Sequence, residues 1–306
     1  MPNIKGLLKR YVSVFLSIFF LSCASFSPVG KVVSVPVADS VESVRPQWLP
    51  FSTEFTRGLD FFEGRVSDPR LDFYALRVNL SDPGLRIVVA GGGVYGGENS
   101  FRSVRVSTFV RENNLLAGIN ALPFDPVSGR EGEARANIGI VVSGGVILSP
   151  PHYGFDALVF FADGGAAIKP QSEINAVLNA VYNAVGGFRR ILENGEIVPR
   201  VLGLNARHPR SAAGLCPEGK FLYLLVIDGR RIGIVGATEA DTASLLRALG
   251  AAEGINFDGG GSSSLALRFP NGRVRPVNTP IHSGIPGRER AVAGSLGVAA
   301  VSANNE

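Results

Sequence analysis

The chain has 306 residues, of which 45% are apolar and 18% are charged, a composition typical of a globular protein with a sizeable core. Its formal net charge is +4, but Lys5, Lys9 and Arg10 supply three of the positive charges near the N-terminus. The rest of the chain is therefore nearly neutral, which gives a nucleic-acid partner no electrostatic support.

The N-terminal segment has the pattern of an export signal. The basic residues are followed by the apolar run Tyr11 to Leu21, which is too short to span a bilayer comfortably, and then by small residues. Phe20-Leu21-Ser22-Cys23 resembles a bacterial lipobox, although Leu is usual at the position of Phe20. We expect a signal peptide over residues 1–23, lipidation of Cys23, and a location in the bacterial cell envelope, on the membrane or in the periplasm. Ordinary signal cleavage near Ala24 is the alternative.

The segment after the signal looks unstructured. Residues 24–52 are rich in Ser, Val and Pro, and the prolines prevent a helix, so this segment is predicted to be a flexible tether. The folded domain is then expected over residues 53–301. Its single cysteine, Cys216, has no disulfide partner if Cys23 carries lipid, and we expect it to be a small buried residue.

The domain is predicted to be built mainly from strands and hairpins. Short apolar segments alternate with turns, and the clearest hairpin turns are Ser143-Gly144-Gly145, Asp163-Gly164-Gly165 and Asn194-Gly195. Residues 103–113 are compatible with a helix. Thr238 and Asp241 form a capping box that begins a second helix, which ends at Gly250. We expect a single catalytic-type α+β domain with a mixed, largely antiparallel sheet, glycine-rich hairpins and packed helices.

The most informative stretch is Gly254 to Ser264. Ile255 and Phe257 alternate with Asn256 and Asp258, so an extended backbone directs the amide and the carboxylate to the same face. Three glycines and three serines follow, and a glycine run suits a sharp turn or the close approach of a ligand to the main chain. The stretch is consistent with a site for an anionic or sugar ligand, or with a tight turn and solvated serines.

Five sequence blocks follow one another in order. They are Ala117-Gly118-Ile119-Asn120 with Phe124-Asp125, Val185-Gly186-Gly187 with Leu192 and Asn194-Gly195, His208 to Gly214 with Val226 to Arg230, Asn256 to Ser263, and Asn278-Thr279-Pro280 with Arg290-Ala291-Val292. Together they resemble the blocks of the phosphodiester glycosidase family, and the resemblance covers about Leu71 to Val301. The chain departs from the family at Ala121-Leu122-Pro123, where Gly-Gly and an aromatic residue are usual. The resemblance implies a hydrolase that cleaves the glycosidic bond of a sugar phosphodiester.

That reaction indicates which residues carry the chemistry. Asp258 is the first candidate for acid, base or nucleophile, because burial and a nearby arginine can tune its protonation. Arg210 is the first candidate for a phosphate clamp, since its planar guanidinium can bind two oxygens, and Arg290 is the second. Asp228 is a weaker second carboxylate. The alternatives are structural: ion pairs for the arginines, and capping of its own glycine loop for Asp258.

Further residues are expected to contact the substrate. Asn120 and Asn256 can hold sugar hydroxyls or N-acetyl groups, and His208 can act as a base or position Arg210. The full predicted binding set is Asn120, Asp125, His208, Asn256, Gly259, Gly260, Gly261, Ser262 and Arg290. The three histidines have no zinc spacing, so no obligatory cofactor is predicted, although Asp258, Asn256 and Asp125 are hard oxygen ligands that would suit calcium or magnesium.

The leading interpretation is an exported, lipid-anchored glycosidase that acts on a phosphodiester-linked, N-acetylglucosamine-like sugar in envelope or extracellular glycans. The departure at Ala121-Leu122-Pro123 leaves a second reading open, a non-catalytic module that binds phosphorylated glycan. A structural envelope lipoprotein on the same scaffold is the third. A serine hydrolase is disfavoured because Ser262 does not lie in a Gly-x-Ser-x-Gly elbow.

Overall fold

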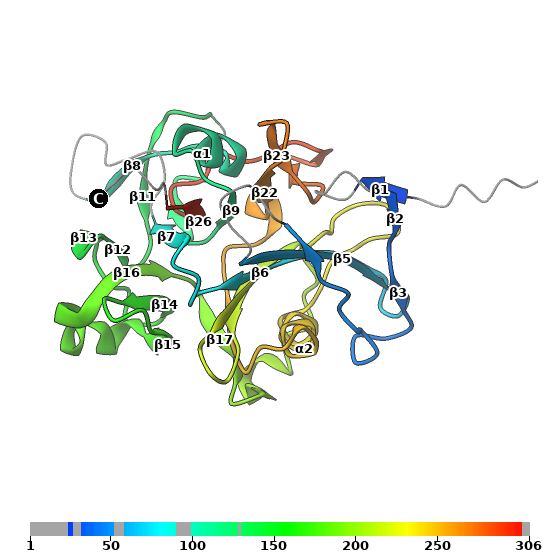
Figure 1. Cartoon of the computed structure of the whole chain (residues 1–306), viewed down its shortest axis with the longest axis horizontal. Coiled ribbons are helices and arrows are strands. Elements are labelled where there is room, and N and C mark those ends of the chain that lie inside the picture. Colours follow the sequence, from blue (N-terminus) through cyan, green and yellow to red (C-terminus); the bar gives the residue numbers. More distant parts are fainter. Residues whose placement is uncertain (1–23, 27–31, 52–57, 90–98, 128–129, 302–306) are drawn as a thin grey trace, which may run out of the picture.

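The computed structural model describes residues 24–26, 32–51, 58–89, 99–127 and 130–301 (Figure 1). The predicted signal peptide and the predicted lipidation site Cys23 lie outside these ranges. Within them, no helix combines the length and the apolar character that crossing a membrane would require.

The largest sheet has nine strands in the order β18-β17-β21-β19-β20-β6-β5-β3, with β4 also paired to β5. Its strands are β3 (Val37–Ala38), β4 (Leu49–Pro50), β5 (Leu59–Val66), β6 (Leu71–Asn79), β17 (Arg189–Glu193), β18 (Glu196–Ile197), β19 (Arg210–Leu215), β20 (Phe221–Ile227) and β21 (Glu253–Asn256). All of its pairings are antiparallel except that of β3 with β5. The predicted antiparallel arrangement is therefore confirmed for this sheet.

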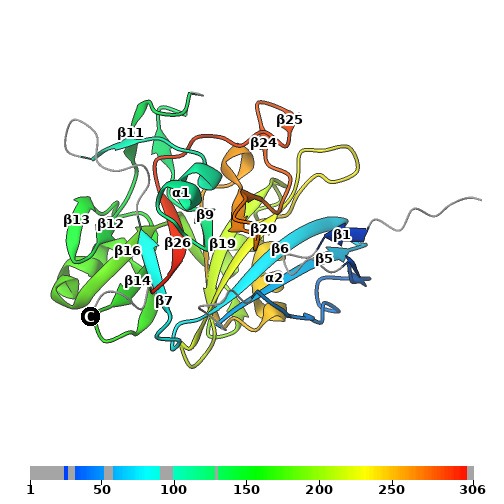
Figure 2. The ribbon, with the colours of Figure 1, turned by 45° about the horizontal axis from the view of Figure 1, so that its top comes forward.

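Two five-stranded antiparallel sheets accompany it. One has the order β23-β22-β9-β26-β7 and contains β7 (Leu85–Val89), β9 (Ala117–Asn120), β22 (Leu265–Arg268), β23 (Val274–Pro276) and β26 (Ser295–Ala300). The other has the order β13-β12-β16-β14-β15 and contains β12 (Val141–Ser143), β13 (Val146–Ser149), β14 (Asp156–Phe161), β15 (Ala166–Pro170) and β16 (Val181–Gly186). In Figure 2 this second sheet lies on the left, beside β7 and β26.

Smaller elements complete the described chain. They are the pair β1 (Ala24–Phe26) and β2 (Val32–Ser34), the three-stranded sheet of β8 (Ser100–Arg102), β10 (Phe124–Asp125) and β11 (Ala134–Asn137), the pair β24 (Ile281–His282) and β25 (Ile285–Pro286), and the 3-10 turns η1 (Gln171–Ala176), η2 (Leu178–Ala180), η3 (Pro199–Val201) and η4 (Gly260–Ser262). The two α-helices are α1 (Val106–Glu112) and α2 (Glu239–Leu249).

The nine-stranded sheet is covered on both faces, which explains why β20 is an unbroken apolar run rather than an alternating one. On one face Leu76, Leu224 and Ile255 join a core that also contains Ile119 of β9 and Leu296 of β26. On the other face the apolar side of α2 packs against the strands in a separate cluster. Figure 1 shows α1 with β22 and β23 on one side of β5 and β6, and α2 on the other.

Helix α2 begins and ends as its sequence predicts. The Thr238 side chain accepts a hydrogen bond from the Asp241 N–H at 3.0 Å, and Asp241 Oδ2 accepts one from the Thr238 N–H at 2.9 Å. Gly250 ends the helix in the left-handed conformation, with φ of 110°. The capping box thus fixes where the helix starts, and Glu239 is its first residue.

Two predictions about the architecture need correction. The α+β description overstates the helices: the two α-helices of the described chain have only 7 and 11 residues, and the fold is mostly β-sheet. The predicted tether is folded from Val37 onward, because β3 and β4 both pair with β5, and Val41, Val44 and Phe51 are buried. Prolines prevent a helix there, but they are compatible with short edge strands.

Candidate active site

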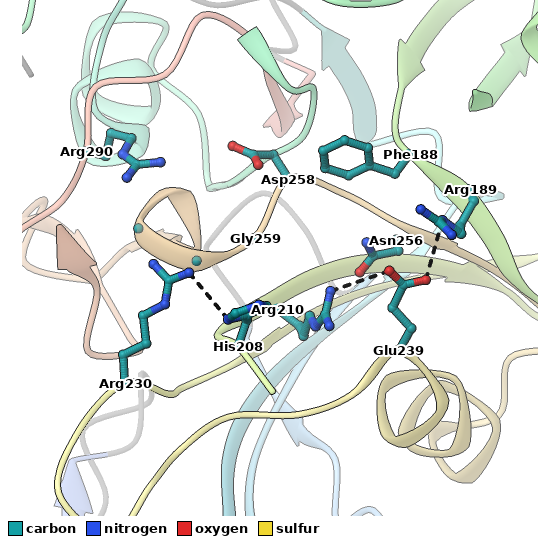
Figure 3. Close-up of a pocket in the computed structure, with 12 residues that line it drawn as sticks. Phe188, Arg189, His208, Arg210, Arg230, Glu239, Asn256, Asp258, Gly259 and Arg290 are labelled. Carbon is teal, nitrogen blue, oxygen red and sulfur yellow. Dashed lines mark hydrogen bonds and ion pairs between the residues drawn. The ribbon is translucent and has the colours of Figure 1, made fainter. Parts of the chain in front are cut away.

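The strand β21 leads into a cavity of about 370 Å³ at one end of the nine-stranded sheet (Figure 3). Asn256 and Asp258 both line it, while Ile255 and Phe257 are fully buried in the core on the other side. The alternation predicted from the sequence is therefore confirmed. The lining residues are Phe188, Arg189, His208, Arg210, Arg230, Glu239, Asn256, Asp258, Gly259, Gly260, Gly261 and Arg290.

The main chain around Asp258 is held firmly from the end of β9. Asn120 Nδ2 donates to the Asp258 carbonyl at 2.6 Å, and the Asp258 N–H donates to the Ala121 carbonyl at 2.7 Å. Asn120 Oδ1 in turn accepts from the Ser211 hydroxyl at 2.7 Å and from the Ser264 N–H at 3.1 Å. Asn120 is completely buried and absent from the cavity wall, so the structure uses it to position Asp258 rather than to contact a ligand.

The carboxyl group of Asp258 has a perturbed protonation equilibrium. Burial raises its pKa from 3.8 to about 6, because desolvation of the charged form outweighs the opposing contributions. Those contributions are a hydrogen bond from Ser262, the charge of Arg290, a hydrogen bond from the Gly259 N–H and the charge of Arg230. The side chain still reaches the cavity, so a group whose proton is lost near pH 6 faces the space where a ligand would lie.

Two arginines flank the glycine run beside Asp258. A Cβ atom at Gly260 would lie 2.9 Å from the guanidinium nitrogens of Arg230, and one at Gly261 would lie 2.5 Å from Nη2 of Arg290. Gly260 also has a φ of 62°, a left-handed conformation that disfavours other residues. A side chain at either glycine would therefore displace a guanidinium group, and at Gly260 it would also strain the left-handed backbone.

Each of these arginines contacts a histidine. Arg290 Nε donates to His282 Nδ1 at 3.2 Å, and Arg230 Nη2 lies 3.4 Å from His208 Nδ1. The pKa of each histidine is lowered, first by burial and then by neighbouring arginines, so both imidazoles are neutral at pH 7. A neutral imidazole can accept from a guanidinium and hold it in place without opposing its charge. Arg290 Nη1 also donates to the Ser262 hydroxyl at 3.2 Å.

The guanidinium of Arg210 lies on the cavity wall, but two carbonyl groups hold it. Its Nε donates to the Ala237 carbonyl at 3.0 Å and its Nη2 to the Ala206 carbonyl at 2.9 Å. Nη1 is 3.6 Å from Oε1 of Glu239, and Nε of Arg189 is 3.6 Å from Oε2 of the same carboxylate. Burial lowers the pKa of Arg210 and Glu239 counteracts this. Glu239 thus lies between two cations on the wall opposite Arg290.

The cavity brings together most of the residues predicted from the sequence. Asp258, Arg210, His208, Asn256, Gly259, Gly260, Gly261 and Arg290 all line it, and Ser262 forms a hydrogen bond with Asp258. Asp125 does not belong to this group, because it is exposed on β10. The cation-ligand set of Asp258, Asn256 and Asp125 is therefore not assembled, and the described residues contain no cluster of three or more His, Cys, Asp or Glu side chains suited to a metal.

Asp228 also lies away from the cavity wall. It is 1% exposed, and its carboxylate accepts from Arg231 at 2.7 Å and from the Thr279 N–H at 3.0 Å. Burial raises its pKa to about 6, despite Arg231 and the hydrogen bonds from Thr279 and Asn278. These contacts tie the turn after β20 to the segment before β24, so the structure assigns Asp228 a positioning contact.

Four lining residues were missing from the predicted site: Phe188, Arg189, Arg230 and Glu239. Arg230 lies within a matched block and Phe188 directly follows Gly186-Gly187 of another, so the motifs contained a signal for these two. Glu239 was interpreted only as part of a helix start. The departure at Ala121-Leu122-Pro123 lies outside the cavity lining, and its first two residues are at most 1% exposed.

Solved structures share this fold. The catalytic domain of zebrafish N-acetylglucosamine-1-phosphodiester alpha-N-acetylglucosaminidase, auto-inhibited by its pro-peptide, aligns with a TM-score of 0.60 and 20% identity over 84% of this chain and 89% of that one. A putative exported protein from Burkholderia pseudomallei K96243 aligns with a TM-score of 0.57 and 16% identity, covering 75% of this chain and 74% of the other. For a hypothetical protein from Synechocystis the TM-score is 0.56 and the identity 16%, with 83% of this chain and 64% of that one covered.

Sequence comparisons give a relative and a family. The SPbeta prophage-derived uncharacterized protein YomE of Bacillus subtilis (strain 168) is 30% identical over 141 residues, which are 42% of this chain. The match spans only 22% of the length of that relative. A family model described as phosphodiester glycosidase matches residues 113–299, more than half of the chain and all of the cavity lining, which confirms that the chain belongs to the phosphodiester glycosidase family.

Proposed function

We propose that this protein hydrolyses the bond between the anomeric carbon of a sugar and a phosphodiester, with an N-acetylglucosamine-like sugar of envelope or extracellular glycans as substrate. The observation that carries the proposal is the position of Asp258. Its carboxyl group, with a pKa near 6, faces a cavity in which Arg230 and Arg290 lie beside it. Membership of a glycosidase family supports hydrolysis, and the cations support a phosphorylated leaving group.

The two arginines and Asp258 have different tasks in this reaction. A departing phosphate carries away the electron pair of the C–O bond and needs no proton, so stabilisation of its negative charge is sufficient. Arg230 and Arg290 are the groups beside Asp258 that can provide this charge stabilisation. Water must attack the anomeric carbon and lose a proton, and ionised Asp258 can accept it, or can first attack the carbon itself. Both routes require Asp258 without its proton.

The test is hydrolysis of N-acetylglucosamine 1-(methyl phosphate) by the purified protein, followed by release of free sugar. Wild-type kcat/KM should rise with pH through about 6, since only the ionised carboxylate is active. Asp258→Asn should reduce kcat by about 10³-fold, within the range for general acid–base groups. Asp163→Asn, at an exposed turn, is the control. Activity that falls as pH rises, or survives in Asp258→Asn, would exclude this role.

Non-catalytic binding of phosphorylated glycan was the alternative suggested by Ala121-Leu122-Pro123. Ala121 and Leu122 are buried behind Asp258, where the Ala121 carbonyl accepts the Asp258 N–H, so this departure no longer favours the alternative. Calorimetry that detected diester binding to an inactive wild-type protein would restore it.

We further propose that the protein is exported and anchored to the envelope membrane through lipid on Cys23. The basic and apolar pattern of residues 1–23 supports this, as does the likeness to the protein from Burkholderia whose description is putative exported protein. Cys23→Ser should move the full chain from the membrane fraction to the soluble fraction of the producing cells. An unchanged distribution would argue for ordinary signal cleavage or for no anchoring at all.

A further inference from the structure

The cavity has two chemically different walls, which Figure 3 shows on its two sides. Arg230 and Arg290 lie on one side with the glycine run between them, and Asp258 lies centrally above. On the other side lie Phe188, Arg189, Asn256 and Glu239. The first wall suits an anion. The second combines carboxylate and amide oxygens with an aromatic ring, and the proposed mechanism does not use it.

The second wall contains two buried acceptor atoms without a hydrogen bond. Oδ1 of Asn256 and Oε2 of Glu239 are both inaccessible and have no partner in the described structure, and the two residues are only 2% and 7% exposed. Buried polar atoms nearly always have partners, because leaving them unpaired in a protein interior is costly. Both residues line the cavity, so a ligand bound there is the nearest source of donors, which a small side-chain movement would bring within reach of these closed atoms.

The neighbouring arginines do not satisfy Glu239. Arg189 Nε and Arg210 Nη1 are each 3.6 Å from a carboxylate oxygen, which is close enough for charge attraction but too long for a hydrogen bond. Arg210 cannot move closer without strain on its bonds to the Ala237 and Ala206 carbonyls. The two cations therefore hold a negative charge in place while leaving its lone pairs to accept from a ligand.

The fold fixes both acceptors in position. Asn256 pairs directly with Arg189 of β17 and Ala212 of β19, so its side chain points to the sheet face that α2 covers. Glu239 is the first residue of α2, and the capping box at Thr238 sets where that helix starts. The sheet and the helix terminus therefore place the two oxygens on the same wall. Phe188 emerges from the loop between β16 and β17 beside them, and its N–H donates to the Asn256 carbonyl at 2.8 Å.

We propose that Glu239 and Asn256 form the glycosyl subsite and accept hydrogen bonds from two neighbouring donor groups of the sugar. The donors are two hydroxyls, or one hydroxyl and an amide N–H. Phe188 offers an aromatic surface for the apolar C–H face of the ring. This inference rests on the proposed function for the identity of the ligand as a sugar phosphodiester.

The kinetic test compares Glu239→Gln and Asn256→Leu with wild type on N-acetylglucosamine 1-(methyl phosphate). Each variant should raise KM at least tenfold and change kcat less than fivefold, because the lost hydrogen bonds contribute to binding. Competitive inhibition by inorganic phosphate should stay within twofold of wild type in Asn256→Leu, which changes no charge in the cavity. A substrate analogue lacking one of the two hydroxyl donors should lose affinity for wild type but not for the variant that lacks the matching acceptor.

Other results would overturn the inference. A collapse of kcat in Glu239→Gln with KM unchanged would make Glu239 a reacting group, and unchanged KM in both variants would show that the substrate makes no hydrogen bond to these acceptors. Thermal unfolding checks that both variants fold, and Asn256→Ser replaces Asn256→Leu if the latter does not.

Calorimetry separates this inference from the proposed function. If the wild type hydrolyses no diester but binds free N-acetylglucosamine, and Glu239→Gln and Asn256→Leu weaken that binding at least tenfold, the subsite stands and the hydrolase assignment falls. If diesters are hydrolysed and both variants keep the wild-type KM, the hydrolase assignment stands and the subsite falls. Binding of inorganic phosphate by both variants shows in either case that the remainder of the cavity is intact.

Discussion

At the scale of single residues, the most informative side chain is Asp258, because its burial and its neighbours act in opposite directions. Its pKa of about 6 in the folded state exceeds the ordinary value of 3.8, so the folded protein holds a proton that the unfolded chain has already released between these two values. The stability contribution of this group is therefore full below about pH 4, declines as the pH rises to about 6, and stays low above it.

This sign predicts that Asp258→Asn stabilises the protein at neutral pH. The neutral amide removes the cost of ionising a buried carboxyl, and a shift of this size corresponds to about 3 kcal/mol in the free energy of unfolding at pH 7.5 and to less than about 1 kcal/mol at pH 4. Urea unfolding at the two pH values measures the difference. Asp39→Asn, an exposed change, is the control. Destabilisation of Asp258→Asn at pH 7.5 would contradict this account.

Asp228 leads to a different prediction, although its pKa is perturbed in the same direction. Asp228→Ala would leave Arg231 with only Asp72, at 3.5 Å, and remove the acceptor for the Thr279 N–H, so it should lower the free energy of unfolding by about 3 kcal/mol. The kcat of the folded protein should fall less than tenfold, since Asp228 does not line the cavity.

Asp60→Ala provides the matched comparison for that substitution. Asp60 pairs with Arg77 at 2.7 Å in a partly exposed position, and such pairs contribute at most about 1 kcal/mol. Loss of kcat in Asp228→Ala as large as that in Asp258→Asn, with stability unchanged, would return Asp228 to the chemistry.

Asp258 and Asp228 show what sequence reasoning can resolve. Asn256 and Asp258 were placed on one face because strand alternation is a local property. Whether Asp228 or Arg230, two residues apart on one turn, faces the cavity is not decided by local sequence. It depends on the left-handed conformation of Arg230 and on the capture of Asp228 by Thr279, some fifty residues further along the chain. Motifs located the turn but left open which of its side chains faces the cavity.

At the scale of elements, the glycine run after β21 offers a controlled comparison. Gly260→Ala introduces a Cβ into a left-handed residue and also 2.9 Å from the guanidinium of Arg230. Gly272→Ala meets similar backbone strain at φ of 77°, but no atom lies within 4 Å of its new Cβ. Both should lose about 1 to 2 kcal/mol of stability. Only Gly260→Ala should also lose activity, by about 10²-fold in kcat/KM, through displacement of Arg230.

Unfolding curves measure the stability of Gly260→Ala and Gly272→Ala, and kinetics measure their activity. Equal activity of Gly260→Ala and Gly272→Ala would show that the position of Arg230 has no bearing on turnover. The sequence alone indicated that this run was special, but it favoured a bare main chain facing a ligand. The structure adds the close packing of Arg230 and Arg290 over Gly260 and Gly261, which depends on segments far away in the sequence.

Helix α2 was predicted correctly while its role was missed. The capping box and the final glycine are local signals, so both ends of the helix could be read from the sequence. That its first residue faces Asn256 depends on how the helix packs across the sheet, for which the sequence contains no local pattern. The helix content was overestimated for a similar reason. Apolar segments between glycine turns do not reveal how many strands join each sheet.

At the scale of the whole molecule, the cavity is assembled from the ends of β17, β19 and β21, the turn after β20 and the start of α2, together with a loop before β26. Family blocks located most of these segments, and the antiparallel register brings Arg189 directly opposite Asn256. Short-range patterns predicted the strands. The order of the strands, and thus the neighbours of each cavity residue, comes from long-range pairing.

Long-range pairing also explains residues 35–51, which were expected to be part of a tether and are part of the fold. Trp48 lies 4.9 Å from the Arg77 guanidinium and 6.0 Å from the ring of Tyr223, and Val41, Val44 and Phe51 are buried against the sheet. Burial of each large apolar side chain contributes about 1.5 to 3 kcal/mol. A chain shortened to begin at residue 53 should therefore be at least about 4 kcal/mol less stable than one that begins at residue 35.

Urea unfolding of the two shortened chains measures this directly, because both lack the signal segment and differ only in residues 35–52. The loss should appear as a lower midpoint together with an increased tendency to aggregate, since β5 would present an uncovered edge where β3 and β4 now pair. Trp48→Ala in the longer chain should reproduce part of the loss, because it removes the contacts with Arg77 and Tyr223 and keeps the strands. Equal stability of the two chains would mean that the segment is a tether after all, and that its pairing with β5 contributes nothing to the fold.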